Sequence, residues 1–415
     1  MKICVIGIGY IGLPTACILS SKGFNVVAID INEKYLKDLK EYKFKSKEKD
    51  LVQLFKQSLE SQNFSLKTYP EKADAFIVCT PTPLDDNNNP DLSYLVQGVN
   101  SIMPLLDKDN MIIIESTIPP GTINNIIRPI IELSGLKVGL HVFLAYCPER
   151  VIPGNIVYEF YNNNRIIGGC TNICGITIAQ FYSMFVKGEI FVTKAEVAEM
   201  IKLVENSYRD VNIALSNEIS IICNELSIDP YEVIRLANKH PRVNLSEPGI
   251  GVGGHCLPVD PYFIVANSPN NSKLIQTSRW INDNMPEYVV LKIEKILSSV
   301  NNPKIGVWGI AYKANSDDIR NSPAMKIVSL LKEKGYNLSL YDPLVTDMSS
   351  DSCKANSYIN SNLLLILVDH DEFKVANYSY ICALMKEPII FDATNKCIDK
   401  SQSLDNIVLY SLANI

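Results

Sequence analysis

A single thiol in a glycine-rich segment is the first feature of this sequence that could do chemistry. Residues 249–263 read GIGVGGHCLPVDPYF, so glycines crowd the chain ahead of Cys256, and Asp260 follows four residues later. A cysteine thiolate is a strong nucleophile, and glycine lets a substrate approach backbone that a Cβ atom would shield. We expect the remaining cysteines to be inert small side chains. We leave the neighbouring His255 out of the chemistry, because adjacent side chains in a loop usually diverge.

A second group of polar residues lies on a long predicted helix. The run KAEVAEMIKLVENSYRDVNIALSNEISIICNEL at 194–226 contains neither glycine nor proline, which predicts one helix that joins two domains. Lys202, Asn206 and Arg209 are spaced i, i+4, i+7 in it and therefore share one face. Spacing alone leaves open whether this face does chemistry or is simply solvated.

The N-terminus predicts a dinucleotide-binding unit. A strand, KICVIG, runs into Gly7, Gly9 and Gly12, a helix follows, and a second strand, FNVVAID, ends in Asp30. The three glycines allow a tight turn, the approach of a pyrophosphate and close packing of helix on strand, with the phosphates at the helix N-terminus. A carboxylate at Asp30 would bind the ribose hydroxyls of NAD and repel the 2′-phosphate of NADP. We therefore expect NAD.

Two further strands end in hydroxyl side chains. ADAFIVCTPTP stops at Thr80-Pro81-Thr82, and NMIIIESTIPPGT stops at Ser116-Thr117. Loops at the carboxyl ends of parallel strands line a cofactor crevice. The alternative is that these hydroxyls only cap the next helix.

The last third repeats the strand–glycine–helix theme. PKIGVWGIAYK runs into Gly306 and Gly309, and a helix and further strands follow. The full three-glycine fingerprint is missing, which predicts a degenerate module for a different nucleotide. Lys313 and Arg320 stand just beyond the turn, where cations could meet phosphate.

These patterns predict an α/β protein with two Rossmann-like, doubly wound domains joined by a long central helix, with an α-helical dimerisation region. We place the NAD-binding domain at 1–190, the central helical and catalytic domain at 191–300, and the second nucleotide-binding domain at 301–415. The chain has 415 residues, which suits two or three domains.

Composition excludes several classes of protein. The net charge of −6 argues against nucleic-acid binding, which needs a basic surface. No stretch of 18 apolar residues and no cleavage-site pattern occurs, so we expect neither a membrane span nor a signal peptide. The cysteines are scattered and number 11, an odd count that favours the reducing cytoplasm over a disulfide framework. Cys170 and Cys174 are the one close pair and lack partners at zinc spacing, so we expect no metal.

Taken together, several motifs resemble the UDP-glucose/GDP-mannose dehydrogenase family of nucleotide-sugar dehydrogenases, over nearly the whole chain. The motifs are the glycines of the N-terminal turn, STIPPGT, YCPERVIPGN at 146–155, Lys202-x-x-x-Asn206 and GIGVGGHCLPVDPYF. Within the family, HPRVN at 240–244 and GGHCLPVDPYF are most similar to the branch whose members oxidise UDP-N-acetyl-D-mannosamine.

The resemblance implies oxidation of the sugar's C6 alcohol to a carboxylate with two NAD and no free aldehyde. Cys256 would add to the bound aldehyde as a thiohemiacetal, which can give up a second hydride, and the resulting thioester would be hydrolysed. The product would be a uronic acid nucleotide, a precursor for surface polysaccharide. Catalytic roles are implied for Cys256, Lys202, Asn206, Asp260, Thr117 and Glu149.

The resemblance implies different roles for these catalytic residues. Lys202 matches the general acid/base that also stabilises a developing oxyanion, assisted by Asn206 and a water. Asp260 matches the carboxylate that orients this cluster. Thr117 matches the residue that holds the hydrolytic water, and Glu149 the carboxylate of acyl hydrolysis.

The resemblance also implies two sets of binding residues. The sugar nucleotide would contact Arg150, Val151, Lys202, Asn206, Arg209, His240, Arg242, Gly253, Tyr312 and Lys313. NAD would contact Gly7, Gly9, Tyr10, Ile11, Gly12, Asp30, Thr82, Thr117 and Arg320. A homodimer or larger homo-oligomer is expected, with Arg242 reaching into the neighbouring site.

Two departures from the family pattern bear on the substrate. UDP-glucose dehydrogenases generally read P-E-F-L-x-E where this chain reads PERVIPG, so Pro153 replaces their second carboxylate. Val259 stands where they carry a lysine. Both changes fit the N-acetylhexosamine branches, count against UDP-glucose and leave the hydrolytic residue open.

Four alternatives remain at this point. UDP-N-acetylglucosamine is the runner-up substrate, and GDP-mannose is more distant. The 3-hydroxy acid dehydrogenases share a dinucleotide domain, a long helix and a K-x-x-x-N pair, but they stop after one oxidation and need no thiol. A non-catalytic protein that keeps both nucleotide modules as sensors would need no thiol either.

Overall fold

The computed structural model describes residues 1–43, 48–151, 154–345, 354–398 and 407–414. They form two compact units. The first comprises Met1–Glu205 with Tyr262–Pro269, and the second comprises Asn206–Pro261 with Asn270–Ile415. The finer division into three domains at residues 190 and 300 stays a prediction.

An eight-stranded sheet forms the centre of the first unit, with the order β3-β2-β1-β4-β5-β6-β7-β8. Its pairs are parallel except for β6 with β7, which run antiparallel, a reversal that the sequence did not indicate. The strands are β1 (Lys2–Ile6), β2 (Asn25–Ile29), β3 (Phe64–Lys67), β4 (Ala75–Val78), β5 (Met111–Ile114), β6 (Phe143–Tyr146), β7 (Arg165–Gly169) and β8 (Ile190–Lys194).

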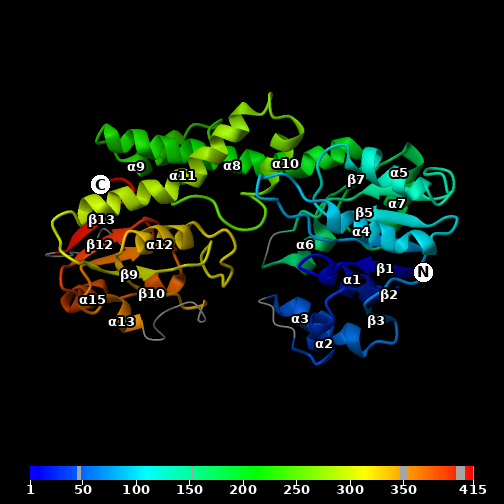
Figure 1. Ribbon diagram of the computed structural model, residues 1–415, viewed down its shortest axis with the longest axis horizontal. Helices are drawn as coiled ribbons and strands as arrows, with labels where there is room; N and C mark the ends of the chain where they lie inside the picture. The colour runs from blue at the N-terminus through cyan, green and yellow to red at the C-terminus, as the bar shows by residue number, and fades with distance from the viewer. Residues whose placement is uncertain (44–47, 152–153, 346–353, 399–406, 415) are drawn as a thin grey trace. The chain divides into compact units, whose positions relative to one another are not determined.

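Helices cover both faces of this sheet because its central strands are apolar on both sides. Strand β5 reads MIII and is buried throughout, as a parallel strand between two helical layers must be. One apolar core is lined by residues of α1, α2, α3, α6 and α7, and the other by residues of α4, η2 and α5. Figure 1 shows the sheet and its helices, with α1, α2 and α3 in blue. The helices are α1 (Gly12–Ser21), α2 (Glu33–Lys40), α3 (Lys49–Glu60), α4 (Ser93–Ile102), η1 (Met103–Leu105), η2 (Ile123–Ile127), α5 (Arg128–Glu132), α6 (Ile156–Asn162) and α7 (Asn172–Ser183).

The glycine turn between β1 and α1 has the predicted form. Gly7 has φ +83°, a left-handed conformation that favours glycine, and its amide donates to the carbonyl of Ile29 (2.8 Å). A Cβ at Gly12 would lie 2.0 Å from the Gly7 carbonyl oxygen, so helix and turn pack too closely for a side chain. A Cβ at Gly9 would meet no atom within 4 Å.

A single helix, α8 (Ala195–Glu225), contributes to both units and confirms the predicted long helix. Its first turns are tied into the first unit by Glu199, which is fully buried. The Glu199 carboxylate accepts hydrogen bonds from the backbone amides of Gly121 (2.6 Å) and Ile123 (2.8 Å). The helix is thereby fixed to the loop that follows β5.

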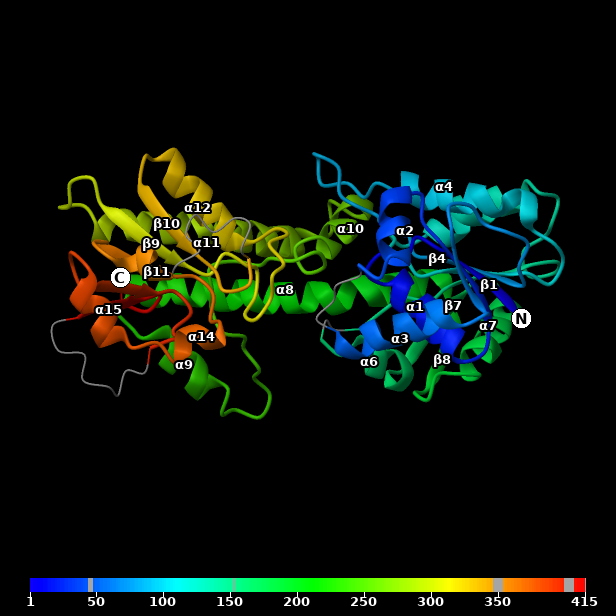
Figure 2. The same cartoon turned by 90° about the horizontal axis from the view of Figure 1, so that it is seen from below.

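The second unit is built on a five-stranded parallel sheet with the order β10-β9-β11-β12-β13. One core lies under α11 and α12 and the other under α13, α14 and α15 (Figure 2). The strands are β9 (Lys304–Trp308), β10 (Asn337–Tyr341), β11 (Leu363–Ile366), β12 (Ile389–Asp392) and β13 (Val408–Ser411). The helices are α9 (Pro230–Ala237), α10 (Asp260–Asn267, mostly in the first unit), α11 (Lys273–Ile296), α12 (Pro323–Glu333), α13 (Lys354–Tyr358), α14 (Asp371–Lys374) and α15 (Tyr378–Leu384).

The predicted fold class is confirmed by these two doubly wound sheets. Strand β13 was not predicted from the sequence. Among the described residues, no helix combines the length and the apolar character that crossing a membrane requires.

Replacing Gly12 by alanine should destabilise the protein by about 1–3 kcal/mol, because the new Cβ must push α1 away from the turn. Gly9→Ala is the matched control, since its Cβ enters open space, and its unfolding free energy should stay within about 0.5 kcal/mol of the parent's. Urea unfolding of both variants measures this. Equal stabilities would contradict the packing assigned to Gly12.

Candidate active site

The segment around Cys256 is a tight loop that favours glycine at two positions. Gly251 and Gly254 have φ values of +123° and +93°, which other residues rarely adopt. The Cys256 carbonyl accepts hydrogen bonds from the amides of Val259 (3.0 Å) and Asp260 (2.8 Å), and this turn starts α10. The Cys256 side chain is half-buried and not part of a disulfide. The sequence-predicted nucleophile thus sits on a bent, defined stretch of backbone.

The polar face of α8 meets the end of this loop. Asn206 is 2% exposed and donates from Nδ2 to Oδ2 of Asp260, which is 3% exposed. Arg209 donates in turn to Oδ1 of Asn206. Within the second unit, this face of α8 therefore holds Asp260 four residues after the thiol and is not merely solvated.

Lys202 lies one turn earlier on α8, in the first unit. Its side chain is half-buried. Within the part of the chain that the structure describes, no carboxylate forms an ion pair with it. An amine without a carboxylate partner is suited to exchanging protons with a substrate.

A buried polar network holds the start of the thiol loop. The Gly249 amide donates to Oδ1 of Asn217 (2.8 Å), and Nδ2 of Asn217 donates to Oδ1 of Asn282 (2.9 Å). Asn282 and Arg279 both donate to the Asp210 carboxylate, at 2.8 and 2.6 Å. The four side chains are at most 1% exposed. The sequence did not indicate this network, because Asp, Asn and Arg in a helix usually lie at the surface.

The turn after β9 packs against the other side of the loop. A Cβ at Gly253 would lie 2.7 Å from Cβ of Tyr312, and a Cβ at Gly254 would lie 3.0 Å from its ring. Lys313 places its Nζ 5.7 Å from the centre of the same ring. Burial raises the pKa of Tyr312, with smaller contributions from the nearby Asp318 and Cys256. Three predicted substrate residues, Gly253, Tyr312 and Lys313, are therefore brought together.

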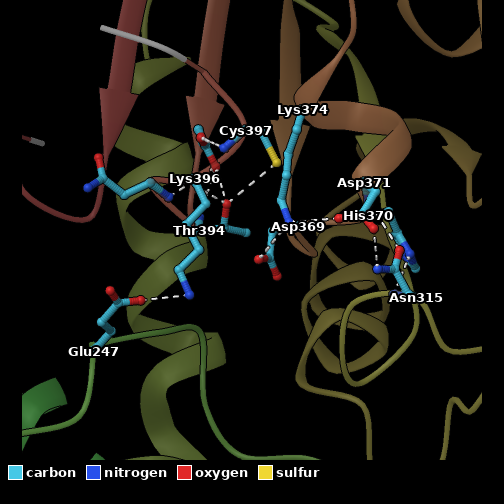
Figure 3. Close-up of polar contacts among 11 residues, drawn as sticks. Glu247, Asn315, Asp369, His370, Asp371, Lys374, Thr394, Lys396 and Cys397 are labelled. Carbon is cyan, nitrogen blue, oxygen red and sulfur yellow. Dashed lines mark hydrogen bonds and ion pairs between the residues drawn. The ribbon is translucent and has the colours of Figure 1, made fainter. Parts of the chain in front are cut away.

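A buried pair, Asp342 and His370, is hydrogen-bonded to the backbone of the same turn. Oδ2 of Asp342 accepts the amide of Ile310 (2.8 Å) and lies 3.2 Å from Nε2 of His370. Nδ1 of His370 accepts the amide of Asn315 (3.0 Å), so Nε2 carries the proton donated to Asp342. Figure 3 shows His370 and Asn315, with the Asn315 side chain bonded to Asp371 (2.8 Å). The turn that carries Tyr312 is thus fixed at both ends.

Burial alone would raise the pKa of Asp342. The hydrogen bonds from His370 and from the backbone amides of Ile310 and Leu344 outweigh burial and lower that pKa to about 2. Asp342 therefore stays ionised and continues to hold the turn at neutral pH.

The first unit carries the predicted cofactor residues around the β1 turn. Oδ1 of Asp30 accepts the amide of Asn32 (2.9 Å), which orients the carboxylate at the end of β2. Tyr10 is 40% exposed beside the turn, and Ile11 is half-buried. The open space over Gly9 fits a pyrophosphate that lies against the backbone.

The two hydroxyl-bearing loops contact each other instead of capping helices. The Thr82 hydroxyl donates to the Thr117 carbonyl (2.7 Å), and the Ser116 hydroxyl donates to the Thr80 carbonyl (2.7 Å). These bonds tie the carboxyl ends of β4 and β5 together beside β1. The crevice interpretation is favoured over helix capping.

Glu149 lies in a buried charged cluster that the sequence did not reveal. It is 7% exposed, and its Oε2 accepts a hydrogen bond from Arg165 (2.8 Å) on β7. Burial opposes the charge of Arg165, but the Glu149 carboxylate raises its pKa above the ordinary value. Tyr182 donates to the nearby Glu115 (2.7 Å), whose pKa is raised by burial and by repulsion from Glu149. Only a weak sequence signal indicated this cluster, because a single arginine in a strand is typical of an exposed strand at the edge of a sheet.

The remaining predicted residues are more exposed. Arg150 makes two bonds to Glu205, at 3.0 and 2.5 Å, in the first unit, and Val151 beside it is half-buried. Pro153 lies outside the described residues. His240 and Arg242 are both exposed and contact each other.

Arg320 was predicted to bind NAD, whereas its observed partners are polar groups of the second unit. Its guanidinium bonds Asp318 (2.6 Å) and lies 3.2 Å from Nδ1 of His255. Its role toward NAD stays a prediction.

Comparison with known proteins agrees with this arrangement. Residues 1–186 match the NAD binding domain of the UDP-glucose/GDP-mannose dehydrogenase family, residues 196–284 its central domain and residues 306–400 its UDP binding domain. The chain belongs to this family. It is accordingly an NAD-dependent dehydrogenase.

Several relatives are similar over almost their full length. The UDP-N-acetyl-D-mannosamine dehydrogenase of Methanocaldococcus jannaschii is 46% identical over 401 residues, which are 95% of this chain and 92% of that protein. The enzyme of the same name from Escherichia coli is 38% identical over 90% of this chain and 95% of that one. A solved UDP-N-acetyl-mannosamine dehydrogenase from Staphylococcus aureus has a TM-score of 0.92 and 43% identity, covering 100% of this chain and 99% of that one.

For this member of the family, Asp342→Asn should lower the free energy of unfolding by roughly 2 kcal/mol at pH 7, from a pKa near 2 in the folded chain against 3.8 in the unfolded one. A lowered carboxyl pKa stabilises the fold above pH 3.8 and ceases to do so as the pH falls toward 2. The variant should therefore lose less stability than the parent between those pH values in urea unfolding. Asp371→Asn, at an exposed ion pair, is the control and should have little effect. Equal acid sensitivity of parent and Asp342→Asn would contradict the assignment.

Proposed function

We propose that this chain oxidises UDP-N-acetyl-D-mannosamine at C6 to UDP-N-acetyl-D-mannosaminuronate, with two NAD consumed per sugar. The observation that carries the proposal is the thiol loop, in which Cys256 and Asp260 are held beside Tyr312 and Asn206. A thiol is needed for the second oxidation and would be superfluous in an enzyme that stops at the aldehyde. The names of relatives at 38–46% identity support the choice of sugar.

The NAD site would be formed by the turn after β1. Gly7 and Gly12 shape it, Gly9 leaves room for the pyrophosphate, and Asp30 would bind the adenosine ribose. Tyr10, Ile11, Thr82, Thr117 and Arg320 are the further residues that we assign to it. When bound, NAD accepts one hydride from C6 in each of the two oxidations.

In the proposed reaction, protein side chains handle protons and the acyl group. Lys202 would take the proton of the C6 hydroxyl, and Asn206 would help it to stabilise negative charge on that oxygen. The Cys256 thiolate would then add to the aldehyde carbon, so that the S–C6 bond forms as the C6–O π bond breaks, and Lys202 would return its proton to the oxygen to give a thiohemiacetal. After the second oxidation C6 is a thioester.

Hydrolysis of that thioester would release the product. A water held by Thr117 would attack the acyl carbon, Glu149 would accept a proton from it, and the Cys256 thiolate would leave as the S–C6 bond breaks. Arg165 supports this role for Glu149, because a fixed ion pair keeps the carboxylate in one orientation.

The sugar nucleotide would be held mainly by the second unit. Tyr312 and Lys313 would face the nucleotide, and Gly253 would contact it through its backbone, since Tyr312 packs where a Cβ of residue 253 would stand. The residues that we further assign to the substrate are Arg150, Val151, Lys202, Asn206, Arg209, His240 and Arg242.

We also propose a homodimer in which α8 is buried between the two copies. Its exposed apolar side chains recur at intervals that suit one helix face, and these are Val197, Val204, Tyr208, Leu215 and Ile222. Exposed apolar faces of this kind commonly mark protein interfaces. The exposed loop with His240 and Arg242 would then be free to enter the site of the other copy.

The absence of disulfides among the described cysteines supports a cytoplasmic location.

Side-by-side assays of UDP-N-acetylmannosamine, UDP-N-acetylglucosamine, UDP-glucose and GDP-mannose should show the highest kcat/KM with the first. Two NADH should form per sugar consumed, because the thiol permits the second oxidation. Absorbance of NADH and chromatography of the sugar nucleotides measure both quantities. One NADH per sugar would contradict the mechanism, and selective use of UDP-glucose would contradict the substrate.

Cys256→Ser should reduce turnover by at least about a thousandfold, because a hydroxyl is a far weaker nucleophile at neutral pH. NAD binding, followed by calorimetry, should be unchanged. Cys382→Ser is a suitable control, since Cys382 lies in the apolar core beneath the second sheet. A fully active Cys256→Ser enzyme would rule out the covalent route.

A further inference from the structure

The backbone of Gly254, two residues before Cys256, is held on both sides by the segment that precedes α12. The Gly254 amide donates to the Arg320 carbonyl (3.0 Å). Its own carbonyl accepts a hydrogen bond from Nδ2 of Asn321 (3.0 Å). Both backbone polar groups of Gly254 are therefore bound by two consecutive residues of another segment.

Asn321 has a conformation that few residues tolerate. Its φ is +48°, in the left-handed region, where asparagine is favoured over other residues that carry a Cβ. The contact is close, because a Cβ at Gly253 would lie 2.8 Å from the Asn321 carbonyl oxygen and 2.8 Å from Cδ of Pro323. Asparagine is thus the side chain that combines this backbone conformation with a short amide donor.

The segment that holds Gly254 is itself anchored in the second sheet. The Ser322 hydroxyl donates to the Ile310 carbonyl (2.8 Å) and caps the start of α12 by accepting the Met325 amide (3.3 Å). The Tyr312 amide donates to the Asp318 carbonyl (2.9 Å), which closes the loop between β9 and α12. Because its own segment is fixed in this way, Asn321 holds the Gly254 carbonyl in a defined position.

We propose that Asn321 is a positioning residue that aims the Cys256 thiol at C6 of the substrate by fixing the Gly254 carbonyl. The proposal rests on the function assigned to Cys256. Nucleophilic addition is sensitive to small displacements of the attacking atom, whereas binding of NAD and of the nucleotide is not tied to this carbonyl. Loss of the bond should therefore lower kcat and leave both KM values nearly unchanged.

Asn321→Gly tests the proposal with little strain, because glycine adopts the left-handed backbone readily and lacks the side-chain amide. Asn302→Gly is the matched control. Asn302 is also exposed, has φ +47°, and stands before β9 in the same unit. Asn321→Asp is a second variant that preserves size but replaces the donor by a carboxylate facing a carbonyl.

Two readouts follow on the full-length enzyme. The first is kcat and KM with UDP-N-acetylmannosamine and NAD. The second is the rate at which iodoacetamide alkylates Cys256 without substrate, measured by peptide mass spectrometry. Thermal unfolding of each variant checks that the fold is kept.

Asn321→Gly and Asn321→Asp should lower kcat about fivefold to tenfold, the effect of one hydrogen bond, with KM values within twofold of the parent's. Alkylation of Cys256 should become at least threefold faster, because the loosened loop exposes the thiol. A kcat or an alkylation rate within twofold of that of Asn302→Gly would overturn the proposal. A raised KM for the sugar with unchanged kcat would also overturn it, since Asn321 would then be a substrate contact.

Failure of this proposal is distinguishable from failure of the proposed function. The alkylation rate needs no turnover, so it reports on the loop even if Cys256→Ser keeps full activity. An unchanged alkylation rate together with an inactive Cys256→Ser would reject the positioning role and leave the covalent mechanism intact.

Discussion

The thiol loop is rich in glycine ahead of Cys256, and polar side chains from the rest of the second unit hold its backbone in place. Its glycines allow left-handed turns and close approach, but glycine also loses the most conformational entropy on folding. The loop must therefore be fixed from outside. Gly249 is bound by Asn217, Gly254 by the Arg320–Asn321 segment, and Asp260 by Asn206.

These anchors explain why the second unit contains so many buried polar side chains. Asp210 and Arg279 are almost fully buried, and burial of charge is costly unless the charges are paired and fully bonded. A network of apolar residues could hold two helices together equally well. It could not offer an amide oxygen to a backbone N–H group of the loop, as Asn217 does to Gly249.

In the first unit, Glu149 is likewise a buried polar group that is held by a partner. The carboxylate is buried, yet Arg165 gives it a partner in a strand that runs antiparallel to its neighbour β6. The reversal of β7 places this arginine at the end of the sheet close to the loop after β6. The charged pair and the strand direction are thus two aspects of one arrangement.

The sequence predicted the parts that depend on local patterns. The glycine turn at Gly7, the acid at Asp30 and the unbroken helix α8 follow from short-range sterics and periodicity, and the structure has all of them. The antiparallel β7, the buried pair of Asp210 with Arg279 and the contact of Asn321 with Gly254 were missed. These features depend on contacts between segments that are distant in the sequence. From the sequence alone, a residue such as Arg279 is expected to be solvated, whereas the structure buries it.

The proposed reaction depends on a covalent bond between Cys256 and the sugar. Rapid acid quenching during turnover, followed by mass spectrometry of the peptide that contains residue 256, tests this most directly. The predicted result is a thioester of the uronyl nucleotide on Cys256 that disappears when the substrate is exhausted. Turnover without any adduct in that peptide, or an adduct on another cysteine, would contradict the account.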